Sequence, residues 1–270
     1  MLTINQYVKV ESLKQAYELN QKKNHVILGG MLWLKMQNRT VGTAIDLSDL
    51  GLDQIEETAD EYKIGAMVTL RQLEQHRGLI EMTQGAITES VKHIVGVQFR
   101  NLATIGGSIF GRYGFSDVLT LFLALDAQVE LYQKGIVSME EFVKMPYDND
   151  ILIQIRLKKK PMQVVYLSQR NTKTDFPVLT CAMSRIDDQY RCVIGARPNK
   201  AMCMIDQEGI LENLMKVETA DAIAEQFADY VAGQVTTGTN LRASGEYRAI
   251  LVKVLTKRAV LKLKDMRGDI

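Results

Sequence analysis

Two diglycine pairs, each directly behind an apolar run, constrain this chain more than any other feature of its sequence. Gly29-Gly30 follow the short run 26–28, and Gly106-Gly107 follow an apolar-leaning segment that ends at Thr104, in the stretch VQFRNLATIGGS from 97 to 108. The pattern predicts two strand-ending corners. Glycine has no Cβ, so loop amides can approach an anion closely and form a concavity for it. Diglycine also marks ordinary tight turns, so both interpretations stand on the glycines alone.

The rest of the chain alternates between helical and strand-like patterns. Thr69 and Ser116 have the side chains of helix N-caps, and the turn Asp187-Asp188 predicts a hairpin. We expect helices at 12–20, 32–36, 69–73, 81–94, 116–125, 220–232 and 247–263. We expect strands at 26–28, 43–47, 63–66, 127–132, 151–157, 163–167, 179–185 and 191–196.

The second diglycine pair carries a longer motif, which reads QFRNLATIGGS from Gln98, then SD, then LFLALDAQVEL. This motif resembles the FAD-binding subunit of the molybdenum hydroxylases, the family of xanthine dehydrogenase and carbon monoxide dehydrogenase. Their flavin subunit has a pattern close to QIRNxATIGGN, then SD and an apolar helix ending in LDA. The segment 26–34 also looks like the family's other flavin loop, AGGTDL or AGGTWL, and 241–259 looks like its closing helix. The resemblance therefore covers nearly the whole chain, in order.

The resemblance implies an α+β fold with a two-lobed FAD-binding domain of the molybdopterin dehydrogenase type, also called the PCMH type. That domain would span 1–160, with lobes at about 1–55 and 56–160. A small C-terminal α+β domain, three strands followed by helices, would span 161–270. The basic run 158–160 before Pro161 is the best candidate for the boundary.

The resemblance also implies the residues that bind FAD. The first loop would contribute backbone around the pyrophosphate, and the second loop would contribute amides together with the hydroxyls of Thr104 and Ser108. Asp117 corresponds to an acidic residue that contacts the cofactor, although an acid in the first turn of a helix is equally explained by the helix dipole. The full predicted set is Ile27, Leu28, Gly29, Gly30, Met31, Leu32, Thr104, Gly106, Gly107, Ser108, Asp117 and Leu152.

Three positions depart from the family pattern. Met31 stands where a threonine is usual, so one hydroxyl contact to phosphate is missing. Ser108 replaces the usual asparagine, and the loop 110–115 carries Arg112 and Tyr113 in place of small residues. These changes bear on cofactor affinity and on the access of NAD more than on the fold.

In the family, a subunit with 2Fe–2S clusters and a large molybdopterin subunit complete the enzyme. The chain has three cysteines, Cys181, Cys192 and Cys203, and no CxxC pair, so by itself it cannot hold a cluster with four thiolates. We expect those cysteines to be buried packing residues. The resemblance therefore implies one oxidoreductase subunit of a hetero-oligomer, in which electrons pass through the partner's clusters to FAD and then to NAD or another acceptor.

Composition excludes several other classes of function. The formal net charge is +1, which gives no reason to expect nucleic acid or an anionic membrane as a partner. No apolar run approaches the roughly 18 residues of a membrane span, and the N-terminus lacks a signal-peptide core, so we expect a cytoplasmic protein. The three histidines show no metal spacing, and no catalytic motif independent of a cofactor is present.

Two alternatives remain open. The first is a flavin-free assembly module that keeps the fold and docks partners, which Met31 and the altered loop 110–115 favour. The second is a stand-alone flavin oxidase related to the vanillyl-alcohol type, and the short chain and the lack of a dedicated substrate domain argue against it.

Overall fold

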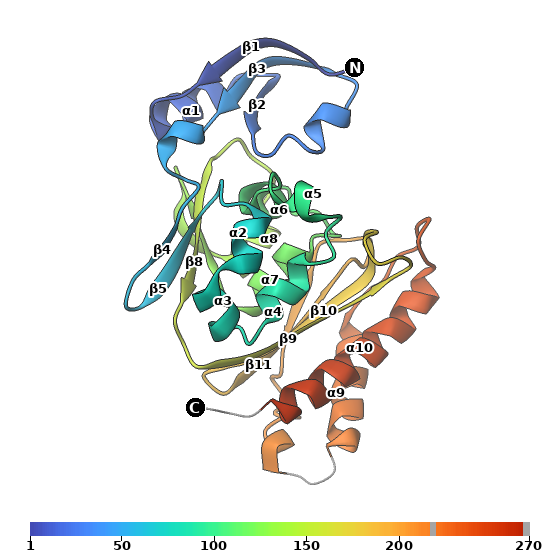
Figure 1. Ribbon diagram of the computed structural model, residues 1–270. Coiled ribbons are helices and arrows are strands. Elements are labelled where there is room, and N and C mark those ends of the chain that lie inside the picture. Colours follow the sequence, from blue (N-terminus) through green and yellow to red (C-terminus); the bar gives the residue numbers. More distant parts are fainter. Residues whose placement is uncertain (217–219, 267–270) are drawn as a thin grey trace. The chain divides into compact units, whose positions relative to one another are not determined.

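A computed structural model describes residues 1–216 and 220–266 of the chain (Figure 1). The protein mixes helices and sheets, so the predicted α+β class is confirmed. It forms two compact units, each assembled from separated segments. Unit 1 comprises 1–73, 96–111 and 127–159, and unit 2 comprises 74–95, 112–126 and 160–270. The division at residue 160 into an FAD-binding and a C-terminal domain stays a prediction.

Unit 1 contains a small parallel sheet with β3 (Thr40–Asp46) between β1 (Thr3–Lys9) and β2 (His25–Leu28). The helix α1 (Leu13–Asn20) connects β1 to β2, and the side chain of Ser12 accepts from the amide of Gln15 at its start. The predicted strands at 26–28 and 43–47 are confirmed and pair in parallel. The expected helix at 32–36 is only one 3₁₀ turn, η1 (Leu34–Met36), and the sequence analysis did not predict β1.

The larger sheet of unit 1 is antiparallel, and in the described residues its strand order is β4-β5-β8-β6-β7. Its strands are β4 (Ile55–Glu57), β5 (Glu61–Gly65), β8 (Leu152–Lys158), β6 (Gln128–Leu131) and β7 (Gly135–Ser138). The shorter helices of this unit are η2 (Ser48–Leu50), α5 (Val97–Arg100), α6 (Ile105–Phe110) and α8 (Met139–Lys144). The helix α2 (Leu70–Gln75) begins in unit 1.

The second diglycine corner was predicted incorrectly. Residues 97–100 form the helix α5 rather than a strand, and Gly106-Gly107 lie inside α6 rather than in a loop. Thr104 is the N-cap of α6, and it supplies the hydrogen bond that begins the helix in spite of the two glycines.

Unit 2 is organised around a four-stranded antiparallel sheet in the described part of the chain, in the order β12-β11-β10-β9. The strands are β9 (Met162–Arg170), β10 (Pro177–Ile186), β11 (Gln189–Gly195) and β12 (Met202–Ile205). The C-terminal part therefore has one strand more than the three predicted. Asp187 and Asp188 both have positive φ, as a tight hairpin turn between β10 and β11 requires, so the predicted hairpin is confirmed.

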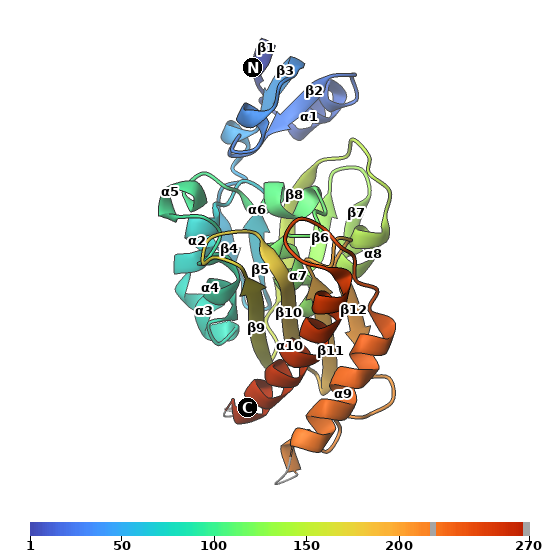
Figure 2. The same ribbon diagram turned by 90° about the vertical axis from the view of Figure 1, so that its right-hand side faces the viewer.

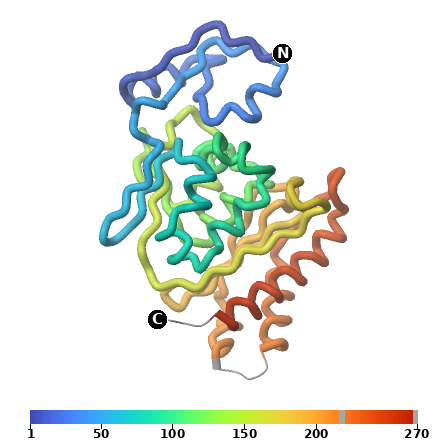
Figure 3. Tube along the Cα trace, in the orientation of Figure 1, coloured from blue at the N-terminus to red at the C-terminus, as the bar shows by residue number. Residues whose placement is uncertain are grey.

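Helices pack on this sheet. The long helices α9 (Asp221–Gln234) and α10 (Gly245–Asp265) run side by side (Figure 2), and their path is followed most easily in the tube (Figure 3). The helix α10 packs on β9 and β10. The helix α7 (Asp117–Ala124) contacts β10 and β11, and α4 (Ala86–Val91) contacts β9. The remaining described helices are α3 (Arg77–Met82) and η3 (Leu214–Lys216).

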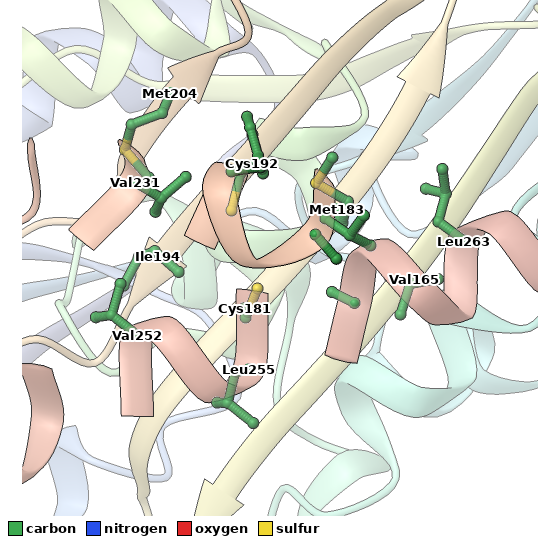
Figure 4. Close-up of a cluster of buried hydrophobic side chains, with 14 of the residues drawn as sticks. Val165, Cys181, Met183, Cys192, Ile194, Met204, Val231, Val252, Leu255 and Leu263 are labelled. Carbon is green, nitrogen blue, oxygen red and sulfur yellow. The ribbon is translucent and has the colours of Figure 1, made fainter. Parts of the chain in front are cut away.

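Nearly every residue of β10 is buried, because helices cover both of its faces. On one face Thr180 bonds Thr120 of α7, and Ser184 donates to the carbonyl of Ala124. On the other face Cys181 and Met183 join Cys192 and the apolar residues of α9 and α10 (Figure 4). The prediction that the cysteines are buried is confirmed for Cys181 and Cys192, whereas Cys203 is half-buried.

The expected single helix from 81 to 94 is wrong. The segment is broken between α3 and α4, where Gln84 and Gly85 both take positive φ. The apolar spacing that suggested one helix is real, but it comes from two short helices that share a core. Within the described ranges, no helix is both long enough and apolar enough to cross a membrane.

Candidate functional site

The loop 29–32 follows the buried end of β2 and is the first of the predicted cofactor segments. Lys35 donates to the carbonyl of Met31, but in the described part of the chain the four amides of this loop donate to no protein acceptor. Met31 has a φ of 58°, so its peptide units depart from both strand and helix geometry. Four successive amides without partners make a site to which an anion can bind by main-chain hydrogen bonds.

The two glycines of this loop have different reasons to be glycine. A Cβ on Gly30 would lie 1.8 Å from the carbonyl oxygen of Leu102, so the backbones of the loop and of residues 102–103 are in direct contact. A Cβ on Gly29 would lie 3.0 Å from Oγ1 of Thr104. Leu28 is buried, and Ile27 is half-buried and packs against a core cluster of unit 1.

The second predicted segment has its amides occupied. Ile105 donates to the carbonyl of Val68, and Gly106 donates to that of Ala66, each at 2.8 Å. Gly107 donates to Oγ1 of Thr104 at 3.1 Å. The amide and the hydroxyl of Ser108 both donate to the carbonyl of Thr104. The expectation of free amides here is therefore wrong, because the cap of α6 and the chain at 66–68 accept them.

Thr104 brings the two predicted segments together. Its Oγ1 lies close to both Gly29 and Gly107, and it accepts from the amide of Gly107. An accepting hydroxyl keeps its own hydrogen to donate elsewhere. Leu152 belongs to the same unit, at the start of β8, which α6 contacts, and its side chain is buried. Within unit 1 the structure therefore gathers the loop 29–32, residues 104–108 and Leu152.

Asp117 belongs to unit 2, where its carboxylate is buried at the start of α7. It forms an ion pair with Arg170 and accepts from the hydroxyl of Tyr166 at 2.5 Å. Burial raises the pKa of Asp117 from 3.8 to about 6, against the opposing effect of the Arg170 charge. The hydrogen bond from Tyr166 lowers the pKa of Asp117, whereas burial and the Asp117 carboxylate raise the pKa of Tyr166.

Tyr166 and Arg170 were not among the predicted site residues. No local motif connects them to Asp117, because they come from β9, some fifty residues further along the chain.

The chain matches the family described as "FAD binding domain in molybdopterin dehydrogenase" over residues 3–158. It belongs to that family. The predicted recognition, the fold class and FAD as the cofactor are thereby confirmed, and the chain is an FAD-binding oxidoreductase component.

Several proteins are similar to this chain over almost its full length. The chain is 26% identical to the uncharacterized protein YgfM of Escherichia coli, with 93% of each chain covered. It is 24% identical to the nicotine 6-hydroxylase medium subunit of Paenarthrobacter nicotinovorans, covering 95% of this chain and 96% of that one. Its fold matches a chain of carbon monoxide dehydrogenase from Oligotropha carboxidovorans with a TM-score of 0.83, 21% identity and coverage of 98% and 99%.

The residues of the first loop fit the cofactor. FAD carries a pyrophosphate, and the unpaired amides of 29–32 are donors of the kind that phosphate oxygens accept. Gly29 and Gly30 keep side chains away from those amides. Among the described residues, no group of three or more His, Cys, Asp or Glu side chains is placed to hold a metal ion.

Proposed function

We propose that the chain is the flavin subunit of a molybdenum hydroxylase-type dehydrogenase and relays electrons from iron–sulfur clusters on a partner subunit to NAD or another acceptor. FAD, when bound, supplies the redox chemistry. The chain's own residues bind and orient it. We also propose that residues 1–160 form the FAD-binding domain, that 161–270 form the C-terminal domain, and that the protein is cytoplasmic.

The observation that carries this proposal is the run of four unpartnered amides at 29–32 in a member of this family. Its role would be to hold the pyrophosphate. We propose that Thr104 donates its hydroxyl beside this loop, and that the peptide of Leu152 lies near the flavin ring. We propose that Asp117 contacts the cofactor as well, in the orientation set by Tyr166 and Arg170.

Partners are supported by the name of the relative and by the cysteine count. The nicotine 6-hydroxylase relative is called a medium subunit. This chain has three cysteines, two of them buried in the core of unit 2, so clusters ligated by four thiolates would have to be held by another chain. A 2Fe–2S subunit and a molybdopterin-binding large subunit are the proposed partners.

The test is the visible absorption spectrum of the purified chain, followed by identification of any cofactor released on denaturation. We expect a flavin spectrum and released FAD. A colourless protein that also fails to take up added FAD would contradict the proposal and favour the flavin-free docking module. Turnover of a substrate by the isolated chain would instead favour the stand-alone oxidase.

A variant pair makes the test specific to the site. Gly107→Val places a branched side chain beside Thr104 Oγ1, where even a Cβ would lie at 3.2 Å, and should expel FAD. Gly233→Val is the matched control, because it also lies in a helix but a Cβ there meets nothing within 4 Å. Retention of stoichiometric FAD by a folded Gly107→Val protein would count against this site.

A further inference from the structure

Unit 2 contains a polar pocket of about 370 Å³ that none of the predicted site residues lines. The helix α4 contributes Glu89, His93 follows that helix, and the end of β9 and the turn behind it contribute residues 166–173. Apart from Leu167 and the ring of Tyr166, the lining side chains are polar or charged. The volume is that of an ordinary small-molecule site, but the lining suits a polar ligand rather than an apolar one.

The charges at this pocket do not cancel. Glu89 is paired with Lys92 at 2.6 Å, and Arg170 is paired with Asp117. Lys173 has no ion pair with any described residue, so one positive charge is left over. Ser168 accepts from Nε of Arg170 at 3.3 Å, which leaves its hydroxyl hydrogen available as a donor.

His93 is the second uncompensated group. Its Nδ1 is buried and has no hydrogen-bond partner among the described residues. Burial lowers the pKa of His93, and the charges of Lys92, Arg170 and Lys173 lower it further, with only Glu89 acting in the other direction. A neutral imidazole held beside surplus positive charge becomes easier to protonate when an anion arrives.

We propose that this pocket is an anion-binding site for the phosphate group of a small polar molecule, with Lys173 and His93 as its two cationic contacts. A phosphate dianion matches the lysine together with a protonated histidine, whereas a carboxylate matches the lysine alone. Ser168 and the turn amides of residues 171–174, which donate to no described acceptor, add neutral donors. The volume leaves room for the molecule that carries the phosphate.

The chain offers a direct probe, because it has only three histidines. In the full-length, FAD-loaded protein, histidine-ring NMR would follow all three through a pH titration, with inorganic phosphate or with sodium chloride at equal ionic strength. We expect phosphate to raise the pKa of His93 and to leave His25 and His76 unchanged. The ring of His76 already accepts from the amide of Leu79, outside the pocket lining. His93→Gln assigns the resonance.

Lys173→Met tests the site without disturbing the core, since this side chain is exposed. Losing one charge-assisted contact should weaken phosphate binding about tenfold. The matched control is Lys262→Met, another exposed lysine of unit 2 without an ion pair among the described residues, which should change binding less than about twofold.

Three outcomes would overturn the proposal. Equal responses of all three histidines would show non-specific binding, and acetate binding as tightly as phosphate would refute the phosphate class. Release of FAD by phosphate, seen as a change in the flavin spectrum, would make the pocket part of the flavin site. The proposed function rests on a different readout, the identity of the bound cofactor, so the two can fail separately.

Discussion

The two diglycine segments of unit 1 have nearly the same sequence signature and opposite hydrogen-bonding states. At 29–32 the backbone amides have no partner in the described chain, and at 105–108 every amide is bonded to a protein acceptor. In both pairs one glycine is required by the protein's own backbone, Gly30 against Leu102 and Gly106 against Ala66. A glycine pair therefore indicates that two backbone segments lie close together. Whether the pair binds a ligand or only allows packing depends on whether its amides already have protein acceptors.

The largest effect is expected at the tightest of these contacts. Gly30→Ala places a Cβ 1.8 Å from the Leu102 carbonyl oxygen, so the loop must separate from residues 102–103. We expect a loss of about 3 kcal/mol or more in the free energy of unfolding, measured by urea denaturation. Gly29→Ala meets only a hydroxyl at 3.0 Å and should cost about 1 kcal/mol.

Gly233→Ala is the control for both, since an unhindered helical glycine should gain about 0.5–1 kcal/mol on the same substitution. A Gly30→Ala protein as stable as the wild type would show that Gly30 is not in direct contact with the backbone of Leu102.

A pH titration separates main-chain recognition from the side chain of Asp117, because neither glycine segment contains an ionisable group. The folded pKa of about 6 lies above the ordinary 3.8, so the folded state binds a proton more tightly than the unfolded state. Stability contributed by this proton is complete below pH 3.8 and is lost as pH rises to about 6, by at most about 3 kcal/mol. Asp117→Asn should remove that slope in unfolding experiments across the same pH range.

A substitution at Thr104 tests the hydrogen bond that its hydroxyl accepts from the amide of Gly107 in the second segment. Thr104→Ala removes the acceptor for Gly107, and we expect a loss of about 1 kcal/mol, as for other helix caps. Thr104→Ser keeps the hydroxyl and should restore both stability and FAD affinity, measured by flavin fluorescence. An alanine variant that binds FAD as tightly as the serine variant would exclude the hydroxyl from the site.

Met31 tests whether the backbone of the first segment, 29–32, is strained. Its φ of 58° suits glycine better than a side chain, so Met31→Gly should raise the free energy of unfolding by up to about 1 kcal/mol. Met36→Gly, at an exposed methionine in the 3₁₀ turn η1, should lower it slightly. A loss of stability at both positions would mean that the Met31 side chain contributes packing that outweighs the backbone strain.

Much of the fold was predictable where a local rule applied. Thr69 and Ser116 cap helices because their side chains reach the free amides three residues on. Asp187-Asp188 turns because short polar residues tolerate positive φ. The predicted strands are present at nearly the expected positions, and the family motif identified the cofactor.

The failures arose where distant segments decide the local structure. Nothing near Thr104 announces that Val68 and Ala66 will accept the amides of α6, so the helix looked like a turn. The fourth strand, β12, depends on pairing with β11 across a turn. The environment of Asp117 depends on Arg170, and a single sequence does not contain that pairing.

The segments of the two units alternate along the chain, and this determines which truncated fragments can fold. The helix α7 lies before residue 160 in sequence, yet the strands that cover it, β10 and β11, come after that point. A fragment ending at 160 would carry α7 without the strand β10 that bonds to Thr120 and to the carbonyl of Ala124. Such a fragment should aggregate, or fold only when residues 161–270 are supplied with it.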